Sequence, residues 1–445
     1  MEYTLTKNAQ DACLETLAKI MSYPSVIDES DEATPFGQSI QDCLEGTLAI
    51  CEDFGFRTYI DPEGYYGYAE VGEGEELFAI LCHLDVVPVG DEKDWTYPPF
   101  EATIVDGKLY GRGSIDDKGP TATVIHAVKT LMDSGVEFDK RVRLIFGTDE
   151  ETLWRCMNRY NEIEEKADYG FAPDSAFPLT YAEKGLLNVF LEGAGTDQLT
   201  INSDGAFNMV PGTAEYSGKN LDKVVAELDK LGFEYELNGE ELTVFGEAIH
   251  SKDSDKGVNA LMRLVQALNG VYDHKPLQFL TKYFADGALA KGIFGTVEDE
   301  VSGPLTLNFS KLIINEEESK IGFDIRVPVT YDDDELMKKL ADAAAEYDLK
   351  YVEFDHLRSL YVPKESEYIQ TLMGIYQELT GDTESEPMSS GGATFARTMD
   401  NCVAFGALLP GYPGTEHQVN EFVVVSNLFD AMEIYAHAIK QLAAK

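Results

Sequence analysis

His83 and Asp85 are the first residues of this sequence whose types and spacing indicate chemistry. They follow a short apolar stretch, residues 77–81, that predicts a buried strand, and in an extended chain side chains two residues apart leave the same face. A histidine whose second ring nitrogen is held by a carboxylate is the arrangement that a metal ligand requires. A core histidine paired with an acid has the same pattern, so this pair alone does not decide between the two.

Four more residues of the same kind each lie just past a predicted strand. In a mostly parallel sheet, ligands bind beyond the carboxyl ends of the strands, so residues at these positions gather at one edge. A merely acidic surface does not explain a set collected at strand ends. The four residues are Glu150, Glu151, Asp174 and His417.

A fifth acid, Asp116, lies in a glycine-containing segment before a helix predicted at residues 121–134. Imidazole and carboxylate ligands together favour zinc, manganese or cobalt over calcium. Two such ions bridged by a carboxylate activate a water and polarise a carbonyl group. Glu150, beside Glu151, would then be the general base. The sequence has no HExxH, which excludes a single-zinc protease of the helix-borne type. The candidate metal ligands are His83, Asp116, Glu151, Asp174 and His417.

The elements that must position these residues predict an α/β protein. Strands alternate with helices up to about residue 183, which indicates a mostly parallel central sheet flanked by helices. From residue 184 the pattern changes to two similar strand-helix-strand blocks, at 213–245 and 321–361, which we interpret as an internal repeat in an inserted α+β domain. We therefore predict a discontinuous domain of residues 1–183 and 361–445, which carries the metal site, and an inserted domain of residues 184–360.

Composition limits the function classes. At 445 residues the chain exceeds one ordinary core, and 80 acidic against 35 basic residues give a net charge of −45. This charge argues against nucleic acid and anionic membranes as partners. Six cysteines without a CxxC pattern, a first stretch without signal-peptide character and the lack of a long apolar segment predict a soluble, cytoplasmic protein.

The remaining histidines differ in their settings. His126 and His437 lie within predicted helices, where packing is the expected role, and His274 and His356 have no motif-like company and are interpreted as surface residues. His250 lies in a glycine-punctuated loop, where functional residues concentrate.

Several motifs in this order resemble the dinuclear metallopeptidase family that includes acetylornithine deacetylase, succinyl-diaminopimelate desuccinylase, aminoacylase and carnosinase. Within it the chain looks most like the bacterial Xaa-His (β-Ala-Xaa) dipeptidases of the dipeptidase V type. The resemblance covers nearly the whole chain. The motifs that carry it are HLDVVP at 83–88, WTYPPF at 95–100, YGRGSIDDKGP at 110–120, GTDEE at 147–151 and EHQ at 416–418.

The resemblance implies two divalent metal ions, zinc or manganese with cobalt as a further candidate. Asp116 would bridge them and be joined to Asp117 by a cis peptide bond. One ion would take His83 and Asp174, and the other Glu151 and His417. Asp85 would orient His83, and Glu150 would act as the general base on a water bridged by the two metals.

In the same family the inserted domain is a lid. Its matching positions are Asn208 and Arg326, which hold substrate, and His250, which stabilises the oxyanion. Arg326 and the N–H groups of the Gly391-Gly392 loop would receive the terminal carboxylate of the peptide. One departure is that the proline usual shortly after the lid histidine is missing after His250.

The sequence thus predicts a metal-dependent dipeptidase that cleaves short peptides with a free C-terminal carboxylate. The alternatives are an N-acyl-amino-acid deacylase on the same scaffold and a metal- or peptide-binding relative without catalysis. Two similar blocks in one lid predict a monomer, because relatives with a single-block lid dimerise and borrow the lid histidine.

Overall fold

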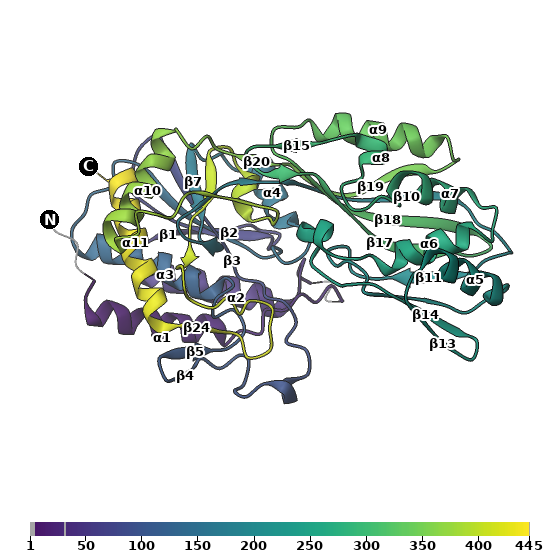
Figure 1. Cartoon of the computed structure of the whole chain (residues 1–445). Helices are drawn as coiled ribbons and strands as arrows, with labels where there is room; N and C mark the ends of the chain where they lie inside the picture. The colour runs from purple at the N-terminus through teal and green to yellow at the C-terminus, as the bar shows by residue number, and fades with distance from the viewer. Residues whose placement is uncertain (1–4, 31–32, 445) are drawn as a thin grey trace. The chain divides into compact units, whose positions relative to one another are not determined.

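The computed structural model describes residues 5–30 and 33–444, and the chain divides into two compact units. Unit 1 comprises the chain up to residue 181 together with 361–388 and the part from 393 onward, and unit 2 comprises 182–360 and 389–392. Figure 1 shows the elements of both. The sequence had not separated 389–392 from the first domain. This segment belongs with unit 2 because Arg326 Nη1 donates to Gly391 O at 2.9 Å and the Lys184 N–H donates to Ser390 O at 3.0 Å.

A nine-stranded sheet forms the framework of unit 1. Its order is β1-β2-β6-β3-β7-β22-β9-β20, with β21 paired to β9. The centre is parallel, because β3 pairs in parallel with β6 and β7, and β7 pairs in parallel with β22. The strands are β1 (Arg57–Ile60), β2 (Tyr66–Val71), β3 (Leu77–His83), β6 (Arg141–Gly147), β7 (Tyr169–Ala172), β9 (Thr180–Glu183), β20 (Leu360–Tyr361), β21 (Met388–Ser390) and β22 (Cys402–Ala404).

Helices cover both faces of this sheet, since every residue of β3 is buried. The mixed α/β class with a mostly parallel centre is therefore confirmed. The helices are α1 (Lys7–Met21), α2 (Gln38–Asp53), α3 (Lys118–Asp133), α4 (Arg155–Ile163), α10 (Glu367–Thr380) and α11 (Val425–Ala443). Two small sheets complete the unit, from β4 (Thr103–Val105), β5 (Lys108–Tyr110) and β24 (Phe422–Val424), and from β8 (Ser175–Ala176) and β23 (Ala407–Leu408).

Local sequence signals set the helix ends of unit 1 where the chain returns to it. Ser366 Oγ accepts the Ile369 N–H at 3.3 Å at the start of α10, and Gly381 ends this helix with a φ of 72°. Gly406 takes a positive φ of 75° between β22 and β23 and separates these two short strands.

His126 is a packing residue of α3, as its helical position predicted. Its side chain is buried, forms a hydrogen bond of 2.8 Å with Thr16 Oγ1, and packs edge-on against the ring of Phe54 at 5.2 Å between centroids. Burial lowers the pKa of His126 to about 4, and the charge of Lys129 adds to this effect. The folded chain therefore resists protonation at this site.

We expect His126 to make the stability of the protein depend on pH. In the unfolded chain histidine has a pKa near 6.5, so the unfolded chain binds the proton more readily than the folded one. The contribution of neutral His126 to the free energy of unfolding is therefore complete above pH 6.5 and is lost as the pH falls toward 4. By pH 5 the loss should reach about 2 kcal/mol. Urea unfolding gives the free energy of unfolding at pH 7.5 and at pH 5.0. The difference between these two values should be smaller for His126→Gln than for the unsubstituted chain. An equal difference would contradict this account.

A five-stranded antiparallel sheet forms the framework of unit 2, in the order β11-β17-β18-β10-β19. Its strands are β10 (Gly185–Ala194), β11 (Ile201–Asp204), β17 (Thr306–Ile314), β18 (Glu318–Val327) and β19 (Lys350–Leu357). A separate three-stranded sheet consists of β12 (Thr213–Tyr216), β13 (Tyr235–Asn238) and β14 (Glu241–Phe245). A short pair consists of β15 (Glu298–Asp299) and β16 (Gly303–Pro304). The helices are α5 (Leu221–Leu231), α6 (Ala260–Asn269), α7 (Lys275–Phe284), α8 (Lys291–Phe294) and α9 (Asp333–Ala345).

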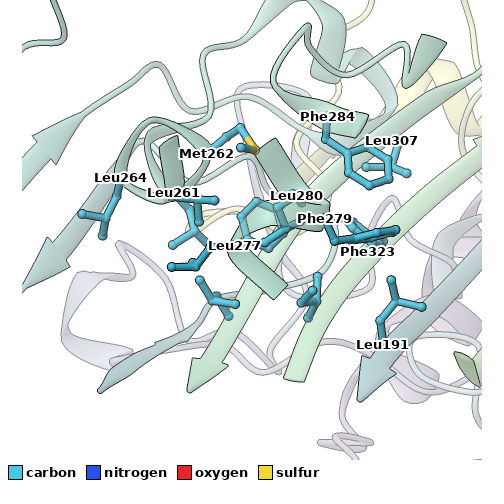
Figure 2. Close-up of a cluster of buried hydrophobic side chains, with 14 of the residues drawn as sticks. Leu191, Leu261, Met262, Leu264, Leu277, Phe279, Leu280, Phe284, Leu307 and Phe323 are labelled. Carbon is cyan, nitrogen blue, oxygen red and sulfur yellow. The ribbon is translucent and has the colours of Figure 1, made fainter. Parts of the chain in front are cut away.

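One hydrophobic core holds unit 2 together. Leu261 of α6 and Leu277 and Phe279 of α7 are fully buried and belong to the same cluster as Leu191 of β10 and Phe323 of β18 (Figure 2). Along β10, buried residues alternate with partly exposed ones. The helices thus cover one face of the sheet, while the other face carries polar groups.

The two predicted blocks contain the expected elements but join different sheets. The first block, at 213–245, makes the separate three-stranded sheet around α5. In the second block β18 and β19 are separated in the five-stranded sheet by β10, and β20 belongs to the sheet of unit 1. Similar element order therefore does not give similar strand pairing. In the second block, β10 from outside the block takes the place between β18 and β19.

Among residues 5–30 and 33–444, no helix is both long and apolar enough to cross a membrane. All six cysteines are buried and none forms a disulfide.

Candidate metal centre

Three neighbouring parallel strands bring four of the predicted residues to one edge of the sheet of unit 1. His83 is the last residue of β3, Glu150 and Glu151 follow the end of β6, and Asp174 follows the end of β7. Because β3 lies between β6 and β7 and all three run in parallel, their carboxyl ends meet. This is the edge at which open α/β sheets bind ligands.

Asp116 and His417 reach the same edge from loops. Asp116 lies two residues before α3, and its peptide bond to Asp117 is cis, as the resemblance implied. His417 lies in the loop between β23 and β24 with a positive φ of 60°. The five ligands predicted from the sequence therefore lie together in unit 1.

His83, Asp116 and Asp174 form one possible metal site. His83 Nε2 lies 2.9 Å from Asp116 Oδ1 and 3.8 Å from Asp174 Oδ2, and one ligand atom from each residue lies within 4.8 Å of the others. His83 and the two carboxylates thus offer one nitrogen and two oxygens to a single point.

Asp116, Glu151 and His417 form a second such site. His417 Nε2 lies 3.0 Å from Asp116 Oδ2 and 3.1 Å from Glu151 Oε2. Asp116 thus directs one oxygen to each histidine. Nitrogen and carboxylate donors in these two sets fit zinc or manganese and suit calcium less.

The charges of the centre shift its pKa values strongly. Hydrogen bonds with Asp116 and Glu151 raise the pKa of His417 to about 10. Burial raises the pKa of Glu150 well above its ordinary value, and the negative charges of Glu151 and Asp116 add to this. Burial and Asp116 likewise raise the pKa of Asp174. So many acids in one place favour the binding of cations.

Asp85 supports two of the ligands rather than one. Its backbone oxygen lies 3.0 Å from His83 Nδ1, while its carboxylate Oδ1 is farther away at 3.6 Å. The other carboxylate oxygen, Oδ2, accepts the backbone N–H of Glu151 at 3.0 Å. Asp85 therefore positions the segment of Glu150 and Glu151 in addition to holding the ring of His83.

Glu421 is a supporting residue that the sequence did not reveal. It is fully buried, and its carboxylate accepts from Arg112 Nη1 at 2.6 Å and from the Ile115 N–H at 3.0 Å, one residue before Asp116. Burial raises its pKa to about 7. No motif marks Glu421, since its only signal is an acid directly before the apolar strand β24.

A third group of possible ligands, in unit 2, is an ion-pair network instead. Asp333 Oδ2 lies 2.7 Å from His356 Nε2, and the guanidinium of Arg358 pairs with both Asp333 and Asp334. Arg358 supplies the positive charge that a metal would bring. His356 and His274, which the sequence analysis interpreted as surface residues, are both partly exposed, and His274 Nε2 lies 2.9 Å from Ser319 Oγ.

The predicted substrate residues belong to unit 2, whereas the predicted metal ligands belong to unit 1. Arg326 of β18 is buried, and its Nε and Nη2 donate to the two oxygens of Asp324 at 2.6 and 2.7 Å. His250 is partly exposed, and Asn208 is exposed.

In the Gly391-Gly392 loop, one N–H and one carbonyl group have hydrogen-bond partners within unit 2. The Gly392 N–H donates to Ser390 Oγ at 2.9 Å, so it already has an acceptor within the loop. Gly391 accepts from Arg326 through its carbonyl group, and a Cβ atom at Gly391 would lie 3.0 Å from Lys252 Cβ. Its lack of a side chain permits this close approach.

The structure thus combines an α/β fold with two candidate metal clusters that share Asp116. Comparison with known proteins agrees: residues 79–441 match the model of peptidase family M20/M25/M40. The chain belongs to this family and is a metallopeptidase, which confirms the resemblance seen in the sequence.

Individual relatives cover the chain almost completely. A Bacillus subtilis protein named "Putative dipeptidase YtjP" is 32% identical over 99% of both chains. The structure of aminoacylhistidine dipeptidase from Vibrio alginolyticus covers 99% of this chain and 98% of its own, with a TM-score of 0.59 and 12% identity. The Bacillus subtilis protein YXEP, described as a dinuclear metal binding peptidase, covers 97% and 98% with a TM-score of 0.52 and 11% identity.

Proposed function

We propose that the chain hydrolyses the peptide bond of dipeptides and short peptides that have a free C-terminal carboxylate. The observation that carries the proposal is the pair of three-residue clusters that share Asp116 at the carboxyl edge of the sheet. Membership of a family whose relatives include proteins named as dipeptidases supports a metal-dependent dipeptidase.

The donor set fits two divalent ions, which we propose to be zinc or manganese, with cobalt also compatible. His83 and Asp174 would hold one ion, Glu151 and His417 the other, and Asp116 both. Bound there, the ions would lower the pKa of a water molecule and polarise the peptide carbonyl group.

Glu150 is the proposed general base. Its backbone lies next to the ligand Glu151, and burial and neighbouring charges raise the pKa of its carboxyl group. A carboxylate with a raised pKa accepts a proton from the attacking water and then returns it to the leaving amine. Asp85 places Glu150 through the Glu151 N–H.

His250 is the proposed oxyanion donor. Its Nδ1 accepts the backbone N–H of Lys252 at 3.2 Å, which leaves the proton of the neutral ring on Nε2. Burial lowers the pKa of His250, and the charges of Arg326 and Lys252 act in the same direction. A neutral imidazole with a fixed Nε2–H is a suitable donor to a developing negative charge.

Arg326 and Asn208 are the proposed residues for the substrate carboxylate and amide. The guanidinium of Arg326 already donates to Asp324, Ser251 Oγ and Gly391 O. The edge of the guanidinium formed by Nε and Nη2 is thus directed at Asp324. We propose that Arg326 donates to the substrate through a single Nη1 N–H and does not form a bidentate pair with it. In this proposal unit 2 is the lid of the enzyme.

We further propose that the chain acts as a monomer in the cytoplasm. Two blocks of similar element order within one lid support the monomer, and the buried cysteines without disulfides agree with a reducing compartment.

A substrate panel separates the dipeptidase from the N-acyl-amino-acid deacylase. At matched metal loading we expect turnover of dipeptides to exceed that of N-acetyl amino acids by about 100-fold, because the chain shares its overall sequence with proteins named as dipeptidases. Release of free amino acid is measured for both classes, with C-terminally amidated dipeptides as a control that should react slowly. Faster turnover of the acetylated compounds would favour the deacylase, and no turnover of either class would favour the binding protein.

A further inference from the structure

The segments that carry Asn208 and His250 hold each other through a short backbone ladder. Met209 and His250 pair as an isolated antiparallel bridge, the Ser251 N–H donates to Asn208 O at 2.8 Å, and the Val210 N–H donates to Ile249 O at 2.9 Å. Neither segment belongs to a sheet, and Asn208 and Met209 are exposed. A ladder this short needs an anchor in a rigid element to fix its position.

Asn308 is that anchor. It lies in β17, which pairs with β18 at this position and with β11 farther along the strand, and it is 1% exposed. Its Nδ2 donates to Phe207 O and to Met209 O, both at 2.8 Å. The two carbonyl groups flank Asn208, so one buried amide uses both of its N–H bonds to fix the backbone on each side of this residue.

The cross-strand neighbour of Asn308 is connected to the segment of His250. This neighbour is Asp324, whose carboxylate accepts two hydrogen bonds from the guanidinium of Arg326. Arg326 Nη2 in turn donates to Ser251 Oγ at 3.2 Å, one residue after His250. Asn308 and, through Arg326, its neighbour Asp324 therefore connect the sheet to both loop segments.

The second polar side-chain atom of Asn308, Oδ1, points to the same connection. Asn308 and Ser254 both line a cavity of about 50 Å³, and Asn308 Oδ1 and Ser254 Oγ are buried with no hydrogen-bond partner among the described residues. Both residues therefore border the same small cavity, whose lining is mainly apolar. Ser254 belongs to the short helix that follows His250, Ser251–Lys256.

We propose that Asn308 is a positioning residue for the reaction: it sets the location of Asn208 directly and of His250 through the ladder. This role rests on the proposed function, in which His250 and Asn208 contact the substrate. An asparagine is required because aspartate, of the same size, has no N–H to donate and would place a negative charge against two carbonyl oxygens.

The test compares Asn308→Ala with Asn308→Asp, which keeps the side-chain volume. We expect kcat on a dipeptide to fall 10- to 100-fold for both, with metal content unchanged, because the metal ligands belong to unit 1. KM should rise less than kcat falls, since the oxyanion donor acts mainly in the transition state. In hydrogen exchange, the Val210 and Ser251 amides should exchange at least 10-fold faster than in the unsubstituted chain.

Asn188→Ala is the matched control. Asn188 of β10 flanks Asp324 from the other side, and its Oδ1 is also buried without a partner among the described residues. The Asn188→Ala variant should keep kcat within threefold of the unsubstituted chain and leave the exchange rates of the Val210 and Ser251 amides unchanged. Equal effects of Asn188→Ala and Asn308→Ala, or unchanged kcat or exchange in both Asn308 variants, would overturn the proposal. If the unsubstituted chain cleaves no dipeptide, the proposed function fails, and the exchange comparison alone decides whether Asn308 holds the two segments.

Discussion

Glu150→Gln should reduce kcat about 10²- to 10⁴-fold and leave the metal content unchanged. Glutamine keeps the size of the side chain but accepts no proton. The variant therefore lacks the group that takes a proton from the attacking water and passes it to the leaving amine. The ligand Glu151 keeps its own backbone contact, because the Glu151 N–H donates to Asp85 Oδ2 and not to Glu150. The measurements are steady-state kinetics on a dipeptide and elemental analysis of the purified variant.

Glu52→Gln is the control for a general effect of removing one negative charge. Glu52 is exposed in α2, so this variant should keep full activity. A Glu150→Gln variant that retains more than about a tenth of the activity would remove Glu150 from the role of general base. Loss of metal together with activity would instead identify it as a ligand.

Asp116→Ala should remove both metal ions, whereas His83→Ala and His417→Ala should each remove one. The reason is that Asp116 Oδ1 lies at the His83 cluster and Asp116 Oδ2 at the His417 cluster. Activity of Asp116→Ala should fall to the level of Glu150→Gln or below. Metal content per chain, measured after dialysis against a weak chelator, reports the difference directly.

The ion-pair network of unit 2 supplies the matched control. His356→Ala changes a histidine that contacts a carboxylate at 2.7 Å, but Arg358 neutralises that carboxylate. Its metal content should therefore equal that of the unsubstituted chain. If Asp116→Ala retained as much metal as either histidine variant, a bridging role for Asp116 would be wrong.

The framework of unit 1 and its ligands could be predicted because the relevant signals are local. An apolar stretch that ends in a histidine or an acid specifies both a buried strand and the edge at which its last residue lies, as for His83 and Asp174. Parallel pairing then brings such ends together whatever the order of the strands, so the ligand set did not depend on knowing that β3 lies between β6 and β7.

Features that depend on long-range pairing could not be predicted. Glu421 reaches Ile115 across more than 300 residues, and Asn308 reaches Phe207 across about 100, with no motif at either position. The contact of the Gly392 N–H with the hydroxyl group of Ser390 is local, but no motif indicates it. Strands β10 and β17 were also missed, since their partners belong to distant parts of unit 2.

The position of unit 2 within the chain has a consequence for biosynthesis. Unit 2 is inserted between β9 and β20, so β22 and His417 leave the ribosome only after it. The nascent chain can thus assemble His83, Asp116 and Asp174 early, but Glu151 lacks its histidine until the last part of the chain has been made. The central sheet also stays open at β7 until β22 arrives. With the ligands assigned as proposed, the cluster of His83, Asp116 and Asp174 can therefore form earlier in synthesis than the cluster that includes His417.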